Sequence, residues 1–248
     1  MYRDHIPQVK VKVGISACLL GEPVRYDGGH KRSAFCADML AQFVEYVPLC
    51  PEAAIGLGIP RPTIRLEQHD ENIIAKSADG RDVTNELRQY GEEQAKNQTE
   101  ISGYIFCAKS PSCGMERVKV YKGASKMSEG IGVGVYTEQF QKHQPLLPLE
   151  ENGRLNDVLL RENFVTRIYA YAHWQSIEKS GLTAAKLLEF HSVYKYLVMA
   201  HSISAYKELG ALLADLKGNV ESKAECYIYA FMKALSKPVS RKAHANVL

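Results

Sequence analysis

The chain has 248 residues, of which 46% are hydrophobic and 24% charged, with six cysteines and a formal net charge of +3 at pH 7. This composition is ordinary for a soluble globular protein, and it excludes a membrane span because no apolar run approaches the roughly 18 residues that one needs. The polar residues 1–5 show no secretory signal, so we expect a cytoplasmic protein whose thiols stay reduced.

Three short apolar runs read as buried strands that end at or near a cysteine. Residues 11–17 run into Cys18, residues 46–49 run into Cys50, and residues 103–107 lead through a loop to Cys113. In an open parallel sheet, ligands sit outside the carboxyl ends of the strands. We therefore expect these three cysteines to converge on a single site at one edge of a sheet.

The other elements expected before residue 150 alternate between helix and strand. Ser33 can cap a helix over residues 34–45, since Phe35, Met39, Leu40 and Phe43 fall on one face. In chain order we also expect a helix start at residues 50–54, a hairpin of 63–66 with 72–76, a helix over 84–98, a Gly/Ser-rich loop over 123–134 opening a helix over 135–142, and an edge strand over 145–149.

After residue 150 the strand signals end and helical periods follow, over residues 156–179, 183–200, 202–215 and 219–235. The predicted fold class is therefore α/β. A Rossmann-like domain with a mostly parallel sheet, residues 1–152, is followed by an all-α domain, residues 153–248.

The six cysteines divide into two groups. Cys36 and Cys226 lie on apolar faces of predicted helices and Cys107 lies within an apolar strand, so packing is favoured for these three. The other three are flanked by Gly or Pro, and none belongs to a close C-x-x-C pair of the kind that structural zinc sites use. They suit a [4Fe–4S] cluster with one open iron, or a catalytic metal with an open position. The alternative is three unrelated core or loop cysteines.

A basic run follows the third strand. Within residues 109–126 a single acidic residue, Glu116, stands against five cations, which are Lys109, Arg117, Lys119, Lys122 and Lys126. Such a run suits an anionic substrate or a phosphate backbone. A solvated surface loop is the alternative.

Several motifs together resemble a known family. Residues 16–21 (SACLLG), 25–28 (RYDG), 50–52 (CPE), 60–62 (PRP) and 109–114 (KSPSCG) are similar in kind and order to the thiouracil desulfidase (TudS-type) family. Residues 153–157, 160–164 and 244–248 resemble the helical YbgA-type domain. The fused arrangement looks like the tRNA 4-thiouridine desulfidases (RudS-type).

The resemblance implies a [4Fe–4S] cluster held by Cys18, Cys50 and Cys113, whose fourth iron is free to take the sulfur of a thiocarbonyl base. It also implies hydrolytic, non-redox removal of that sulfur from 4-thiouridine in tRNA, giving uridine and sulfide. Two alternatives stay open. One is the same chemistry on free thiouracil or a thiouridine nucleotide, and the other is a metal-dependent RNA-binding or stress-response protein without desulfidation.

The resemblance also assigns catalytic roles. Glu52 matches the family's catalytic glutamate, a general base or acid that positions water, and an apolar wall that raises its pKa would help. Its alternative role is to favour the N-terminus of the following helix. Ser110 matches the active-site serine, which would hydrogen-bond the base edge or the leaving sulfur, and its alternative role is turn capping. Ser112 is the weaker serine candidate.

Substrate-binding candidates lie on two loops. Arg25, Tyr26, Asp27 and His30 follow Cys18 and could line the pocket, while Lys109 could meet a phosphate.

One departure from the family pattern concerns the end of the chain. It stops at residues 244–248, a motif that further helices follow in the YbgA-type domain, so the helical domain looks C-terminally truncated. Helices without packing partners expose apolar faces. We therefore expect a looser C-terminal region or a homodimer.

Overall fold

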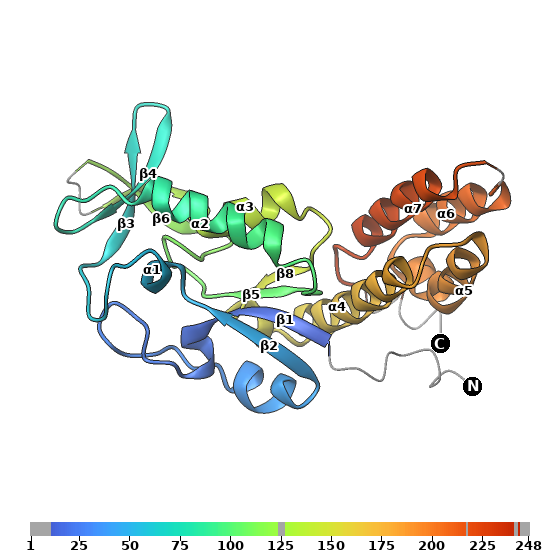
Figure 1. Cartoon of the computed structure of the whole chain (residues 1–248), viewed down its shortest axis with the longest axis horizontal. Helices are drawn as coiled ribbons and strands as arrows, with labels where there is room; N and C mark the ends of the chain where they lie inside the picture. The colour runs from blue at the N-terminus through green and yellow to red at the C-terminus, as the bar shows by residue number, and fades with distance from the viewer. Residues whose placement is uncertain (1–10, 124–126, 217, 241–242, 244–248) are drawn as a thin grey trace. The chain divides into compact units, whose positions relative to one another are not determined.

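The computed structural model describes residues 11–123, 127–216, 218–240 and 243. Residues 1–5, Lys126 and residues 244–248, all used in the predictions above, lie outside the described residues. The chain divides between Asn156 and Asp157 into two compact units. The first unit is α/β and the second is helical (Figure 1), which confirms the predicted fold class.

The first unit is built around sheet A, whose strands all run parallel. The order in space is β2 (Val44–Leu49), β1 (Val11–Ser16), β5 (Tyr104–Phe106) and β8 (Leu149–Glu151). β1 and β5 are central, and the side chains of Ile15, Ile105 and Phe106 are completely buried. Central parallel strands are apolar on both faces, which is why these runs could be predicted from the sequence.

An aromatic cluster packs one face of sheet A against two neighbouring helices, α2 (Thr84–Asn97) and α3 (Val135–His143), which lie side by side (Figure 1). Tyr104 and Phe106 stack with ring centroids 4.2 Å apart, and Tyr136 and Phe140 of α3 contact them edge-on or tilted. Aromatic pairs in these geometries contribute beyond their buried area, so this cluster fixes α3 on the sheet.

Gly14 lets β1 and β5 approach within this packing. A Cβ at Gly14 would lie 2.3 Å from Cδ2 of the buried Tyr104 ring. Gly14→Ala should therefore destabilise the chain by about 1–3 kcal/mol through overpacking, as measured by the midpoint of urea unfolding. Gly130→Ala is the matched control, since its Cβ would meet Val120 only at 3.9 Å. Equal midpoints for the two variants would contradict this account.

The helix predicted over residues 34–45 is wrong in length and in kind. The segment forms one π-helical turn, η3 (Phe35–Met39), and one 3₁₀ turn, η4 (Leu40–Gln42). Only part of the expected apolar face is buried: Leu40 is 4% exposed, whereas Met39 is 54% and Phe43 61% exposed. The segment ends early because Val44 already pairs with Val11 in the ladder of β2 and β1.

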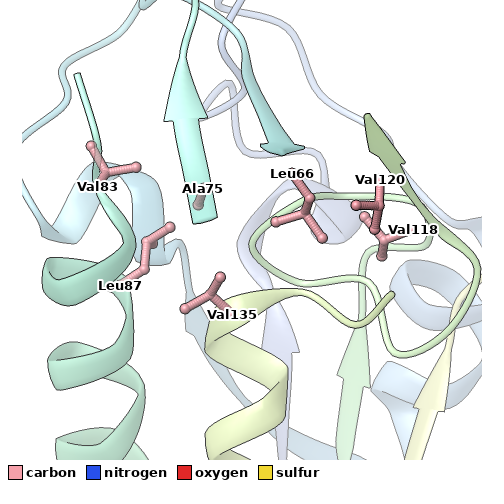
Figure 2. Close-up of a cluster of buried hydrophobic side chains, with 7 residues drawn as sticks. All are labelled: Leu66, Ala75, Val83, Leu87, Val118, Val120 and Val135. Atoms are coloured by element: carbon pink, nitrogen blue, oxygen red, sulfur yellow. The ribbon is translucent and has the colours of Figure 1, made fainter. Parts of the chain in front are cut away.

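A second sheet, sheet B, is mixed. Its order is β4 (Asn72–Ser77), β3 (Ile64–His69), β6 (Val118–Lys122) and β7 (Ser128–Gly132). The predicted hairpin of β3 and β4 is confirmed. However, β7 lies within the region predicted to be a loop, and β6 was not predicted. One face of sheet B forms an apolar cluster with residues of α2 and α3 (Figure 2), made of Leu66, Ala75, Val83, Leu87, Val118, Val120 and Val135.

The predicted edge strand over residues 145–149 is correct in position but not in range. β8 is the edge of sheet A, yet it covers Leu149–Glu151. The proline-containing segment lies before it because proline has no N–H for the ladder. The carboxylate of Glu150 in β8 accepts a hydrogen bond from Arg154 Nε at 2.6 Å, within the short turn η5 (Arg154–Asn156).

The second unit contains the four predicted helices, α4 (Val158–Lys179), α5 (Ala184–His201), α6 (Ile203–Ala214) and α7 (Val220–Ala234). Each begins after a polar N-cap whose side chain accepts a backbone hydrogen bond. Trp174, Phe190 and Phe231 are buried between them. Cys226 was expected to pack but is exposed, because its neighbour Tyr227 takes the buried position. Within the described ranges, the helices are too short or too polar to cross a membrane.

Candidate active site

A cavity of about 300 Å³ lies at the carboxyl edge of sheet A. Cys18, in the short turn η2 (Ala17–Leu20) directly after β1, lines it. Cys50, the residue before helix α1 (Pro51–Ala54), and Cys113, in the loop after β5, line it as well. The structure thus brings together the three thiols that the sequence singles out.

A fourth thiol, Cys107, lines the same cavity, and it is also buried in the core, as its place in an apolar run favoured. Cys107 is buried, but it follows the last residue of β5, and its backbone N–H donates to Ser16 Oγ at 3.0 Å. A hydrogen bond between the two thiols raises the pKa of Cys18 and lowers the pKa of Cys107 to about 7. The cations Lys31 and Arg25 also lower the pKa of Cys107.

The pKa values of the other two thiols, Cys50 and Cys113, are shifted mainly by burial. Burial raises the pKa of Cys50, and it raises the pKa of Cys113 well above the ordinary value. Buried neutral thiols lose their protons when they bind a metal, since the thiolate is the ligand. Thiol donors from several separate segments are thus available in one cavity.

Within the part of the chain that the structure describes, no three His, Cys, Asp or Glu side chains form a group that could hold one metal ion. Cys18, Cys50 and Cys113 reach the cavity from three separate segments, and thiolates are the ligands that iron–sulfur clusters use. These three residues could therefore hold such a group.

Glu52 extends its carboxylate from the first turn of α1 into the cavity wall. Its Oε2 accepts hydrogen bonds from Arg61, at 2.8 Å from Nε and 2.7 Å from Nη2, and its Oε1 accepts one from Ser112 Oγ at 2.8 Å. The side chain is 15% exposed. Its nearest partners are thus a guanidinium and a hydroxyl, and they fix the direction of the carboxylate.

Arg61 is a residue that sequence reasoning missed, although it lies in one of the motifs. Its side chain is only 3% exposed. Besides holding Glu52, it donates to the carbonyl oxygens of Gly58 at 3.0 Å and Val24 at 2.9 Å. The Val24 oxygen also accepts from Cys50 Sγ at 3.7 Å. Arg61 therefore joins the catalytic candidate to the loop that follows Cys18.

The two serines of the KSPSCG motif, residues 109–114, make different contacts. Ser110 Oγ lines the cavity and accepts hydrogen bonds from the backbone N–H groups of Ser112 and Cys113, at 3.2 and 3.1 Å. This is the turn-capping geometry, and it leaves the hydroxyl proton to point elsewhere. Ser112 is fully buried and donates to Glu52. Ser112 thus orients the carboxylate, while Ser110 faces the cavity.

Three of the substrate-binding candidates line the cavity, namely Arg25, Tyr26 and Lys109. The guanidinium carbon of Arg25 lies 5.4 Å from the centre of the Tyr26 ring. Asp27 and His30 are exposed and do not line it. Asp27 accepts from the N–H of Gly29, and His30 Nδ1 accepts from the N–H of Arg32. These two side chains shape the loop.

Lys31 was also missed, although it stands next to His30 in the sequence. It lines the cavity, and its Nζ donates to the carbonyl oxygen of Ala108 at 2.9 Å. Together with Arg25, Lys109 and Arg61 it makes the wall of the cavity cationic, with Glu52 as the acidic member. A lone lysine in a loop gives no sequence signal for such a position.

The loop that carries Cys113 is held in place by hydrogen bonds with Glu151 and Thr137. The Glu151 carboxylate accepts from the N–H of Met115 at 2.6 Å and of Glu116 at 3.3 Å, and burial raises its pKa. Thr137 Oγ1 donates to the carbonyl oxygen of Cys113 at 2.7 Å. Buried bonds of this kind hold a ligand in place, so the position of the third thiol is set by β8 and α3.

Comparison with known proteins identifies the family of the chain. Residues 13–152 match the 2-thiouracil desulfurase family, and residues 195–248 match a family of unknown function, DUF1722. The chain therefore belongs to the 2-thiouracil desulfurase family, enzymes that act on the carbon–sulfur bond of a thiolated nucleobase. The family resemblance inferred from the motifs is confirmed.

Two individual proteins can be compared. The uncharacterised protein YbgA of Escherichia coli is 33% identical over 89 residues, which are 35% of this chain and 53% of YbgA, so the chain spans about half the length of that relative. A solved structure of a [4Fe–4S]-dependent thiouracil desulfidase, TudS, is 31% identical, with a TM-score of 0.49, and the match covers 59% of this chain and 94% of that one.

Proposed function

We propose that this chain is a [4Fe–4S]-dependent desulfidase that replaces the sulfur of 4-thiouridine in tRNA by oxygen. One water molecule supplies the oxygen, the carbon–sulfur bond breaks, and uridine and sulfide are the products, with no net transfer of electrons. The observation that carries this proposal is the convergence of Cys18, Cys50 and Cys113 around one cavity with Glu52 in its wall.

The three thiols would hold the cluster as thiolates. When bound, the cluster supplies an iron with an open coordination position, which is thiophilic and acts as a Lewis acid toward the thiocarbonyl group. The protein holds the three ligands in fixed positions. Cys18 and Cys50 follow the ends of β1 and β2, and the Cys113 loop is held by Glu151 and Thr137, so the sheet and these hydrogen bonds fix the three relative positions.

Glu52 acts on the water. Its carboxylate is directed by Arg61 and Ser112, so it can hold a water molecule near the ring carbon, take one of its protons and pass that proton on. Ser110 lies on the same wall, where its hydroxyl can donate a hydrogen bond to the edge of the base or to the departing sulfur.

The cations at the wall of the cavity suit a nucleotide. Tyr26, with Arg25 over its ring, offers a stacking surface, and the ammonium of Lys109 can meet a phosphate.

A second candidate uses the same chemistry on free thiouracil or a thiouridine nucleotide. The family match is to a 2-thiouracil desulfurase, whose description names a free base. Both candidates need the same thiols and the same glutamate, so they differ in substrate and not in mechanism.

The test is anaerobic reconstitution of the cluster followed by loss of the near-ultraviolet absorbance of a thiolated base. We expect turnover of bulk thiolated tRNA with a higher kcat/KM than that of the free nucleotide. Faster turnover of the nucleotide would favour the second candidate, and no turnover with the cluster present would refute both. A homodimer formed through the helical unit stays a prediction, which the oligomeric state in solution checks.

A further inference from the structure

We infer that the outer face of sheet B, formed by Arg65, His69, Lys76, Lys119 and Tyr121 around Glu67, binds the RNA strand that flanks the thiolated nucleotide. This inference rests on the proposed function. It assigns the partner surface next to the cavity, which neither the family match nor the motifs specify.

The pairing of the strands puts these side chains on one face. Val118 and Val120 are buried in the apolar cluster (Figure 2), so Lys119 and Tyr121, which alternate with them along β6, face the other way. Leu66 is in the same cluster, so its neighbours Arg65 and Glu67 also face outward. Arg65 pairs with Lys76 across β3 and β4, and Glu67 pairs with Tyr121 across β3 and β6.

The accessible charge of this face is positive. Glu67 Oε1 lies 2.6 Å from Arg65 Nη2, and its Oε2 lies 3.3 Å from His69 Nε2 and 3.6 Å from Lys76 Nζ. The glutamate side chain is only 4% exposed, whereas those of Arg65, His69 and Lys76 are 38, 48 and 35% exposed. The carboxylate orders Arg65 and Lys76 and is itself hidden, and the exposed Lys119 adds a third positive charge. The exposed Asp82, which pairs with Lys76, is an acidic group at the edge of this face.

An aromatic ring lies among these cations. The guanidinium carbon of Arg65 is 5.5 Å from the centre of the half-buried Tyr121 ring, and Arg65 Nη2 also donates to the carbonyl oxygen of Gly123 at 3.0 Å. Single-stranded nucleic acids are held by cations along the backbone and by aromatic rings or guanidinium planes against the bases. This face has both the cations and the aromatic ring. A surface that binds only phosphate, or a protein, would not require both.

The face begins at the cavity. Thr63 and Ile64 line the cavity, and Ile64 is the first residue of β3. At a rise of about 3.3 Å per residue, the outward Arg65 and Glu67 lie within about 10 Å of Ile64 along the strand. An enzyme that acts on a base takes it out of the stack, so the neighbouring nucleotides of a base in this cavity must lie on the adjoining surface.

The experiment measures binding of thiolated tRNA to the full chain across a range of salt concentrations. Lys119→Glu should weaken binding about 3- to 10-fold and lower the slope of log K against log salt by about one, as loss of a phosphate contact does. Lys142→Glu, the same change on the exposed side of α3, is the matched control and should alter neither quantity.

A second variant separates stacking from charge. Tyr121→Leu keeps an apolar side chain against the sheet, so it should weaken tRNA binding severalfold without changing the salt slope. Both variants should turn over a free thiouridine nucleotide at the wild-type rate. If both bind tRNA as tightly and with the same salt slope as Lys142→Glu, the inference is overturned. If no variant, wild type included, desulfidates any substrate, the proposed function fails while the binding result still decides this surface.

Discussion

Replacing Cys113 by alanine should leave the anaerobically reconstituted chain without an intact cluster and reduce desulfidation to background. The thiol is 5% exposed, and its loop is fixed by Thr137 and Glu151. The fourth thiol of the cavity, Cys107, is hydrogen-bonded to Cys18, so we expect it not to replace Cys113, and two thiols cannot hold the same group. Iron and acid-labile sulfide content per chain, together with the visible absorbance of the reconstituted protein, are the measurements.

Cys36→Ala is the matched control for this experiment. Cys36 is as buried as Cys113 but does not line the cavity, so its loss should lower stability without lowering the iron content. An intact, active cluster in Cys113→Ala would show that the proposed ligand set is wrong. Loss of iron in Cys36→Ala alone would point to the same conclusion.

Glu52→Gln should lower the rate of desulfidation by about 10²- to 10⁴-fold, the range for loss of a general acid or base, with an unchanged iron content. The amide keeps the shape of the side chain but cannot take a proton from water. The change also leaves the guanidinium of Arg61, only 3% exposed, without its anionic partner, which costs about 3–5 kcal/mol for a buried pair. Single-turnover rates under anaerobic conditions and urea unfolding separate these two effects.

Glu67→Gln provides the comparison, because it also removes a carboxylate that is mostly inaccessible and paired with an arginine, but one that lies outside the cavity. It should lose stability and keep the wild-type rate on a free nucleotide. If Glu52→Gln were as active as Glu67→Gln, Glu52 would be a structural partner of Arg61 and not a catalytic residue.

The sequence predicted the arrangement of the three thiols because the rule behind it is simple. Residues 11–17, 46–49 and 103–107 are short apolar runs, central parallel strands have that composition, and the carboxyl ends of parallel strands share one edge. The helices of the second unit could also be predicted from the sequence. The polar N-caps Asp157, Thr183, Ser202 and Asn219 mark where they begin.

Sheet B and the residues around Glu52 could not be predicted in the same way. In β6, Val118 and Val120 alternate with cations, so the segment resembles a basic loop, and β7 contains two glycines that weaken any strand signal. Arg61 and Cys107 depend on contacts between segments distant in sequence. A buried ion pair or a fourth thiol becomes visible only when the loops are placed in space.

The distribution of the thiols over three segments has a consequence for how the proposed cluster would be loaded. Cys18, Cys50 and Cys113 are separated by long stretches of chain, and none forms a close pair with another. No short peptide can therefore bring the three thiols together, as a C-x-x-C segment brings two. We expect sheet A to assemble first through its apolar contacts and the cluster to be loaded into the folded protein.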